Sequence, residues 1–192
     1  DDEGNLSEDA IGLSLVDIEF GLALMTSQTT PTRKWTALSA SAASVGIAGL
    51  GDLLPTIKNL TVEVNQATKV GDQVVDFETK PLDIATGTGS TLTLDMSGSM
   101  GKLLRAEGDV TFKLLDFAYF KGRIGFEKYT PTKQLTLKNL NTPTALPTYA
   151  TANSMMAITG SNITAFVGYA SGGFDTTKTL EAQKANLYGF GV

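Results

Sequence analysis

Two short segments of the sequence gather the oxygen-bearing side chains that hard metal ions prefer. In residues 95–100, Asp95, Ser97 and Ser99 alternate with Met and Gly residues. Such a loop offers one carboxylate and two hydroxyls to a divalent cation and leaves a coordination position open for the acid of a ligand. Residues 92–94 alternate as a strand does, so this loop is expected to follow a strand.

The second segment is a dense carboxylate cluster at the beginning of the sequence. Its candidate ligands for calcium are Asp1, Asp2, Glu3 and Asn5. Calcium loops bring several oxygens together over a short span. The segment departs from an EF-hand, because Leu6 stands where the sharp turn needs Gly and Gly12 stands where a bidentate Glu is needed. A solvated acidic linker is the alternative.

The composition excludes many other chemistries. The chain has no Cys and no His, so it cannot build disulfides, thiolate nucleophiles, Ser-His-Asp triads or His-ligated metal sites. Its formal charge of −5 and scattered Lys and Arg residues argue against a nucleic-acid partner. No apolar run reaches the roughly 20 residues of a membrane-spanning helix. We therefore expect neither an enzyme nor a membrane span.

The segment around Asp95 resembles the D-x-S-x-S metal-ion-dependent adhesion site of von Willebrand factor A domains. The resemblance implies an α/β fold in which Asp95, Ser97 and Ser99 hold a metal that binds the acid of a ligand. An amphipathic helix should then follow the loop. Instead Gly108 interrupts the chain, and the apolar residues after it alternate with period two. This adhesion domain is the alternative to the structural module argued below.

Period-two alternation dominates the rest of the sequence. Val16, Ile18, Phe20, Leu22 and Leu24 occupy every second position, which gives an extended strand one apolar face. Similar alternation recurs around residues 60–64, 110–114, 135–137 and 163–169. Residues 37–48 are rich in Ala and predict a strand of small residues, and only residues 102–105 and 180–184 suggest a helical turn. The predicted fold is all-β, with little or no helix.

Two architectures remain open for this all-β chain. A small or polar residue precedes an alternating stretch at several places, and some of these places lie near 25 residues apart. Stacked coils of that size would make an elongated β-solenoid. The same pattern is typical of a two-layer β-sheet module, since β-proteins reuse strand and turn chemistry.

The end of the sequence echoes its beginning. Glu19-Phe20-Gly21-Leu22 matches Gly189-Phe190-Gly191-Val192 in the central Phe-Gly pair and in the final aliphatic residue. The offset from Phe20 to Phe190 is 170 residues. We therefore predict that residues 1–192 are one β-rich module with a repeat length of about 170 residues, and that residues 175–192 begin the following repeat. A short match of this kind also arises by coincidence.

Several phrases resemble, in this order, a repeat of very large bacterial exoproteins of the adhesin or hemolysin-type kind. They are residues 20–25, 33–38, 60–65, 75–77 and 104–110. The resemblance implies an extracellular or cell-surface location, a structural or adhesive role and bound calcium. Neighbouring copies of the module are the expected partners, joined end to end into a stalk, fibre or surface layer. A carbohydrate-binding or carboxylate-dependent enzyme domain is a third hypothesis.

Overall fold

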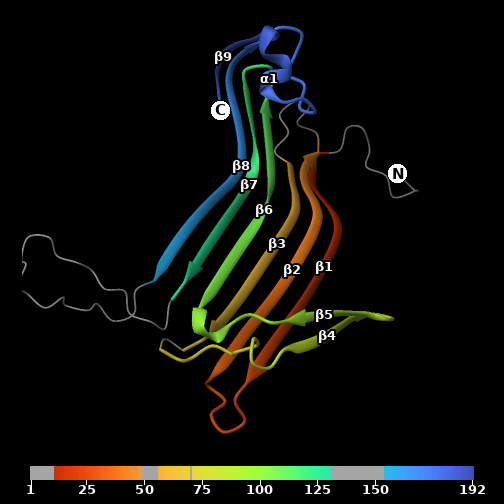
Figure 1. Cartoon of the computed structure of the whole chain (residues 1–192). Helices are drawn as coiled ribbons and strands as arrows, with labels where there is room; N and C mark the ends of the chain where they lie inside the picture. The colour runs from red at the N-terminus through yellow and green to blue at the C-terminus, as the bar shows by residue number, and fades with distance from the viewer. Residues whose placement is uncertain (1–10, 49–55, 70, 131–153) are drawn as a thin grey trace, which may run out of the picture.

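A single antiparallel sheet of seven strands forms the body of the protein (Figure 1). The computed structural model describes residues 11–48, 56–69, 71–130 and 154–192. The strand order is β1-β2-β3-β6-β7-β8-β9, so neighbours in the sheet follow one another along the chain except where β4 and β5 intervene. The strands are β1 (Gly12–Thr26), β2 (Lys34–Ala48), β3 (Thr56–Ala67), β6 (Leu103–Leu114), β7 (Ala118–Tyr129), β8 (Met155–Ala170) and β9 (Leu187–Gly191).

The all-β prediction is confirmed, and the architecture is a sheet module rather than a solenoid. Every strand of the large sheet pairs antiparallel with its neighbour, whereas stacked coils would bring equivalent strands together in parallel. The Ala-rich stretch forms β2, as predicted. A second, partial layer covers one face of the sheet.

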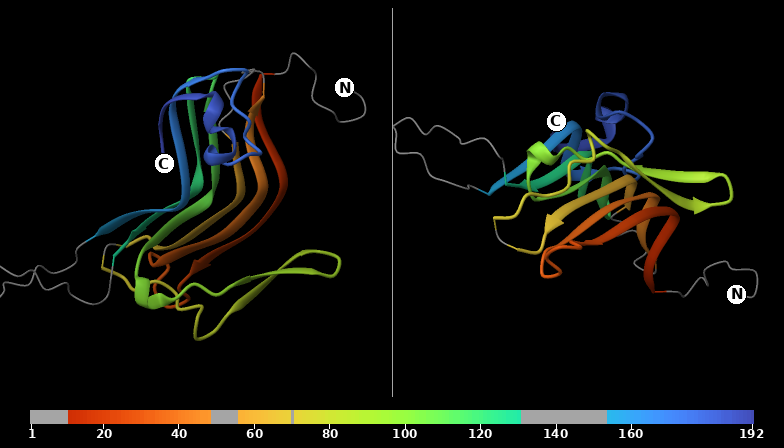
Figure 2. Two further views of the ribbon diagram at one scale, coloured as in Figure 1. Left: turned by 45° about the horizontal axis from the view of Figure 1, so that its top comes forward. Right: turned by 90° about the horizontal axis from the view of Figure 1, so that it is seen from below.

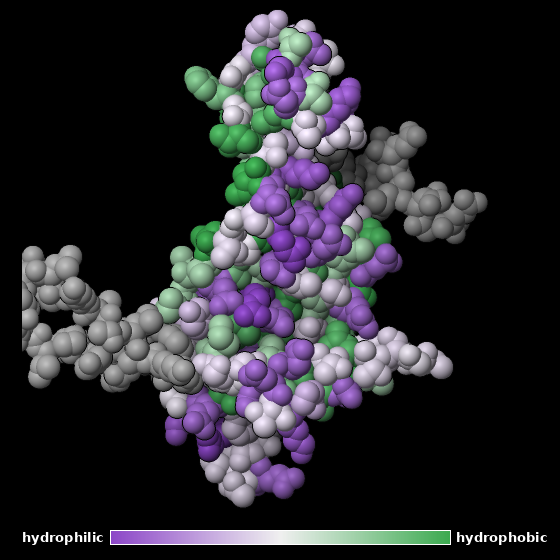
Figure 3. Space-filling model, in the orientation of Figure 1, coloured by the Kyte–Doolittle hydropathy of each residue, from purple (hydrophilic) through white to green (hydrophobic). Residues whose placement is uncertain are grey.

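The pairing registers assign each side chain to one of two faces, because successive residues of a strand point to opposite sides. One row runs across five strands through Ala23, Ala37, Asn65, Leu103 and Tyr129. Further rows on the same side carry most of the charged side chains, including the row Glu63-Arg105-Glu127. We call this side the polar face. Figure 3 shows hydrophilic residues gathered over these strands.

The opposite side of the sheet is lined by aliphatic and aromatic residues, and we call it the apolar face. One of its rows runs through Phe20, Ala40, Val62, Ala106, Phe126 and Ile158. Beyond the middle of the sheet, another row runs through Leu15, Val45, Ile57 and Val110. The apolar face therefore continues along the whole length of the strands.

The strands bend near their middle, and β-bulges lie at the bend (Figures 1 and 2). The register shifts by one residue between Lys58 and Thr61 in β3, and again where β8 passes β7. The extra residues include Asn59 and Asn162, both with φ of 51°. Gly108 faces the first bulge, where a Cβ would lie 2.6 Å from the Ile57 Cγ2 atom. Bulges bend a strand locally, so they explain the curvature of the sheet.

Residues 72–100 cross the polar face at one end of the sheet and form the first part of the second layer. They include the hairpin β4 (Leu82–Gly87) and β5 (Ser90–Leu94), whose tip extends past β1 (Figures 1 and 2). Leu94 and Leu103 are 0% and 2% exposed and pack with Phe77 and Met96 against small residues of β1 and β2. This segment, which we call the strap, is therefore anchored by its own apolar core.

The other part of the second layer is the segment 171–186, which packs on the polar face at the opposite end. Phe174 stacks on Tyr119 with ring centroids 4.3 Å apart and also on Phe166. The short helix α1 (Leu180–Gln183) and the 3-10 turn η2 (Lys184–Asn186) close this segment. Gln183 is buried and its amide donates to the Asp175 carbonyl at 3.0 Å. We call this segment the cap.

The two helical turns predicted from the sequence had different outcomes. The turn expected at residues 180–184 is confirmed by α1. The turn expected at residues 102–105 is wrong, because β6 begins at Leu103. Leu103 is buried in the core beneath the strap, and β6 pairs with β3 and β7 from this residue onward. These tertiary contacts outweigh the weak local preference for a helical turn.

Candidate functional site: a polar belt, an apolar face and two open edges

The Asp95-x-Ser97-x-Ser99 loop is the last part of the strap and leads into β6. Leu94 and Met96 are buried in the strap core, and Asp95 between them is exposed. The Ser97 and Ser99 hydroxyls lie 2.8 Å apart. The loop thus brings the two predicted hydroxyls together, while the carboxylate that binds its backbone comes from another residue.

That carboxylate is Asp76. Its Oδ1 accepts a hydrogen bond from the Gly98 amide at 2.8 Å, and its Oδ2 accepts one from the Thr79 hydroxyl at 2.6 Å. The Thr79 bond, followed by the Gly98 bond, lowers the pKa of Asp76. Asp76 therefore fixes the turn after β5.

The structure does not support the adhesion-domain alternative. That domain needs an α/β fold with a helix after the loop, but here the 3-10 turn η1 (Gly98–Met100) leads directly into β6 of an all-β sheet. Among the described residues, no group of three or more acidic side chains is placed to hold a metal ion. The predicted calcium ligands Asp1, Asp2, Glu3 and Asn5 lie outside the described residues, so that site stays a prediction.

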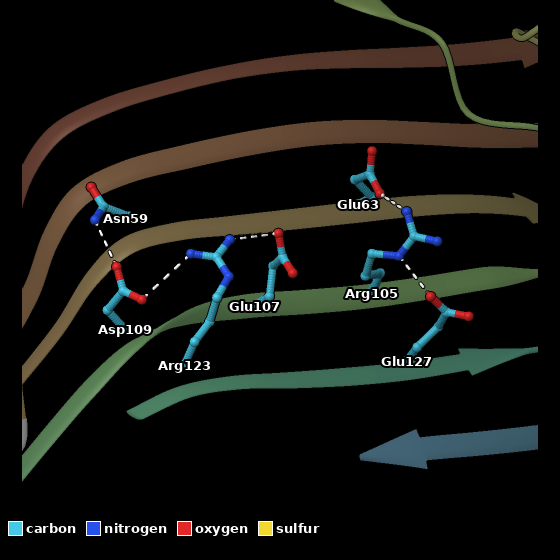
Figure 4. Close-up of polar contacts among 7 residues, drawn as sticks. All are labelled: Asn59, Glu63, Arg105, Glu107, Asp109, Arg123 and Glu127. Atoms are coloured by element: carbon cyan, nitrogen blue, oxygen red, sulfur yellow. Dashed lines mark hydrogen bonds and ion pairs between the residues drawn. The ribbon is translucent and has the colours of Figure 1, made fainter. Parts of the chain in front are cut away.

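A belt of ion pairs crosses the middle of the polar face, and Arg105 is at its centre (Figure 4). The Arg105 Nη1 atom lies 2.7 Å from Glu63 Oε2 on β3, and its Nε lies 2.7 Å from Glu127 Oε2 on β7. Burial opposes the charge of Arg105, but the bonds and charges of Glu127 and Glu63 outweigh it and raise the pKa of the guanidinium. Arg105 thus joins three strands.

The second half of the belt is built around Arg123 on β7. Its guanidinium contacts Glu107 at 2.8 Å and Asp109 at 3.4 Å, both on β6. Asp109 also accepts a hydrogen bond from the Asn59 amide at 2.7 Å, so the bulge in β3 is tied to the belt (Figure 4). That bond is the largest cause of the lowered pKa of Asp109, and Arg123 contributes to it. A hollow of about 370 Å³ lies beside these groups at the bend.

The belt was not foreseen from the sequence, although a signal for it exists. Charged residues recur with period two on neighbouring strands, as in Arg105-x-Glu107-x-Asp109 and Arg123-x-x-x-Glu127. Alternation of this kind indicates a polar sheet face, and opposite charges on adjacent strands indicate cross-strand pairs. The partners depend on the pairing register, which the sequence alone does not supply.

The apolar face has no covering layer within the described part of the chain. Phe20, Ile158 and Phe190 are 61%, 70% and 88% exposed. Other large exposed side chains on this face are Leu13, Leu15, Ile18, Leu22, Leu24, Ile47, Leu114, Met156, Ile163, Val167, Tyr169 and Tyr188. Contiguous apolar surfaces of this kind mark interaction sites, because monomeric proteins rarely expose them.

The two strands nearest the chain ends form the two edges of the sheet. In the hairpin that joins β1 to β2, the Ser27 amide donates to the Arg33 carbonyl at 3.0 Å. Hydrogen-bonded pairs alternate in an antiparallel ladder, so the odd-numbered residues of β1 bond to β2. The backbone groups of Ile18, Phe20 and Leu22 therefore point to the open side.

A groove follows this open edge beneath the strap hairpin. It has a volume of about 710 Å³ and is lined by residues of both elements, including Glu19, Phe20, Ile84 and Thr86. The Thr86 hydroxyl donates to the Glu19 carboxylate at 2.9 Å, which ties the hairpin to the edge strand. The edge thus combines unpaired backbone groups, apolar side chains and an overhanging hairpin.

Within the described residues, no helix is long and apolar enough to cross a membrane. Comparison of this chain with family models, with curated proteins and with solved structures finds no match.

Proposed function

We propose that this chain is a non-enzymatic structural module that assembles with neighbouring copies of itself through its terminal strands. The observation that carries the proposal is that β1 and β9 are the two edges of one sheet. The fifteen residues of β1 have β2 on one side and, within the described chain, no strand on the other. Long unpaired edges recruit further strands.

The apolar face supports the same proposal. Assembly through the edges continues this face from one copy to the next, and apolar faces of two such arrays pack on each other as sheets do, about 10 Å apart. The ion-pair belt on the polar face joins β3, β6 and β7 side by side, which suits a module that bears load across its strands.

An extracellular or cell-surface location and an adhesive role belong to the same proposal. They are supported by the resemblance of residues 20–25, 33–38 and 60–65 to repeats of large bacterial exoproteins. We assign no catalytic residue, because the polar groups of the belt are engaged with one another rather than presented in a deep pocket.

Sedimentation velocity of the whole chain over a range of concentrations tests the assembly. We expect self-association that Leu22→Pro weakens, because proline removes the outward amide of an edge strand and leaves the bonds to β2 intact. The matched control is Leu22→Ala, which also removes the leucine side chain but keeps the backbone amide.

Circular dichroism checks that both variants keep the sheet, and Phe20→Lys blocks the same edge by charge if the proline variant is unfolded. A chain that stays monomeric at all concentrations contradicts the proposal. So does a chain that remains monomeric in buffer and binds lipid vesicles through the apolar face.

A further inference from the structure

We infer that β9 occupies the position of the first strand of a following copy, so that Tyr188, Phe190 and Val192 correspond to Ile18, Phe20 and Leu22. This inference rests on the proposed assembly and specifies its junction. The sequence echo between the two strands is short by itself. The structure adds three independent comparisons between β1 and β9: strand direction, side-chain face and hydrogen bonding.

Strand direction agrees with the inference. Six antiparallel strands (β1, β2, β3, β6, β7 and β8) precede β9 in the sheet. Because neighbouring strands alternate in direction and six is an even number, β9 runs in the same direction as β1. A repeating unit of six strands therefore presents its next first strand in the correct orientation.

The side-chain face agrees as well. Phe190 is paired with Val167 and Tyr188 with Tyr169, and both partners lie on the apolar face. Phe20 lies on the same face, in the row of Ile158. An offset of one residue would have placed the two phenylalanines on opposite faces.

The hydrogen bonds complete the correspondence. The Ala165 and Val192 backbones exchange both of their bonds, at 2.8 and 2.9 Å, so the even-numbered residues of β9 bond to β8. The backbone groups of Gly189 and Gly191 then point to the open side. In β1 the equivalent residues, Glu19 and Gly21, are paired with Ser41 and Ser39 of β2. The inference therefore predicts that β9 is bonded to β8 on one side and that its other side pairs with the β2 strand of the following copy.

The same correspondence sets the step between copies. Phe20 shares a row with Ile158, but Phe190 is opposite Val167, which lies farther along β8 on the other side of the bulge. Each following copy is therefore displaced along the strands, and the array is oblique rather than square.

A fused chain tests this junction. It consists of residues 1–192 followed directly by residues 23–192, so that Leu187–Val192 and the repeated residues 23–26 make one continuous first strand. The matched control omits the repeated Ala23, because a slip of one residue turns the rest of the strand to the wrong face. Amide hydrogen exchange is measured at Gly189 and Gly191 in the single chain, the fused chain and the control.

At a concentration low enough to keep separate chains apart, we expect these two amides to exchange freely in the single chain and the control, and roughly a hundredfold more slowly in the fused chain, where a second β2 accepts their bonds. Free exchange in the fused chain, or a second copy that does not fold, overturns the inference. If the single chain self-associates while these amides still exchange freely in the fused chain, the assembly holds and only this junction fails. If the amides are protected in the fused chain but the single chain stays monomeric, the junction holds and the assembly of separate copies is rejected.

Discussion

Replacing Arg105 by methionine removes the centre of the ion-pair belt and keeps the apolar stem of the side chain. The guanidinium makes two charged hydrogen bonds of 2.7 Å, to Glu63 and to Glu127. Its side chain is 37% exposed, and those of the two glutamates are 23% and 24% exposed. The substitution leaves two half-buried carboxylates on either side of β6 with no cation between them.

The size of the effect follows from this intermediate exposure. Hydrogen bonds to charged groups contribute about 1.5–3 kcal/mol each when they are sheltered, and fully exposed ion pairs contribute about 0.2–1 kcal/mol. Because the guanidinium is more than one third exposed, solvent screening reduces the sheltered value. We expect Arg105→Met to lower the free energy of unfolding by about 2 kcal/mol in total.

Urea unfolding at neutral pH, followed by circular dichroism, measures this loss. Lys184→Met is the control, because Lys184 and Glu181 form an ion pair in which both side chains are largely exposed. It should change the free energy of unfolding by less than about 0.5 kcal/mol. Adding Glu63→Gln and Glu127→Gln to Arg105→Met should recover about 1 kcal/mol, since the unpaired charges are removed.

Two results would refute the reasoning. The first is an Arg105→Met variant as stable as the parent, which would mean that solvent already screens the belt completely. The second is a triple variant no more stable than Arg105→Met, which would mean that the loss came from packing of the arginine stem rather than from the uncompensated carboxylates.

Two further predictions concern the two parts of the second layer. Leu94→Ala should lower the free energy of unfolding by about 3–5 kcal/mol, because Leu94 is 0% exposed beneath the strap, whereas Leu24→Ala at a 73% exposed position should cost under about 1 kcal/mol; equal losses in urea unfolding would contradict the assigned core. In the cap, hydrogen bonds from the side chain and amide of Thr177 lower the pKa of Asp175 to about 2. A lowered pKa stabilises the folded state above the unfolded value of about 3.9 and is lost as the pH falls through the folded value. The difference in Tm between the parent and Asp175→Asn should therefore be full at pH 7 and shrink between about pH 4 and 2, and a constant difference would reject this account.

Much of the sheet could be predicted from the sequence because half-buried strands have apolar residues at every second position. The alternate residues from Ile18 to Leu24 form the predicted apolar face of β1, and the Ala-rich segment forms β2 as predicted. Val16, which the alternation assigns to the same face, lies on the polar side, because the parity of β1 changes at Asp17, whose φ is 50°. The strap was harder to foresee, since its anchors Phe77, Leu94 and Met96 do not form one periodic pattern. Its position over β1 and β2 depends on contacts between residues far apart in the chain.

The geometry of the candidate metal loop could not be predicted from its spacing alone. Asp95, Ser97 and Ser99 have the right types and spacing for oxygen ligands, and alternation along an extended strand would turn all three to one side. The alternation continues only as far as Met96, because β5 ends at Leu94 and the 3-10 turn η1 begins at Gly98. The buried neighbours Leu94 and Met96 fix that alternation and leave Asp95 exposed. A short motif therefore carries chemical meaning only when the surrounding elements turn its members toward one point.

The bend in the sheet has a signature that the sequence does contain. In β8 the apolar face is lined by even-numbered residues up to Ile158 and by odd-numbered residues from Ile163 onward, with the bulge at Asn162 between them. In β3 the same change of parity separates Leu60 from Ile57. A continuous strand that changes the parity of its apolar positions must contain an extra residue, because otherwise half of its apolar side chains would face the polar side.

The same signature explains why the inner strands differ from the outer ones. Apolar positions in β6 stay even-numbered from Leu104 to Phe112, so this strand has no extra residue and instead places Gly108 opposite the bulge in β3. The two bulges share the tripeptide pattern Asn-Leu/Ile-Thr, beginning at Asn59 and Asn162, and an asparagine accepts positive φ more readily than most residues. The curvature is therefore specified on both sides of the inner pair of strands, and β1 changes parity at the same level, at Asp17 with φ of 50°. Deleting either asparagine should turn one end of its strand over, which would expose apolar residues on the polar face and break the register on which the ion-pair belt depends.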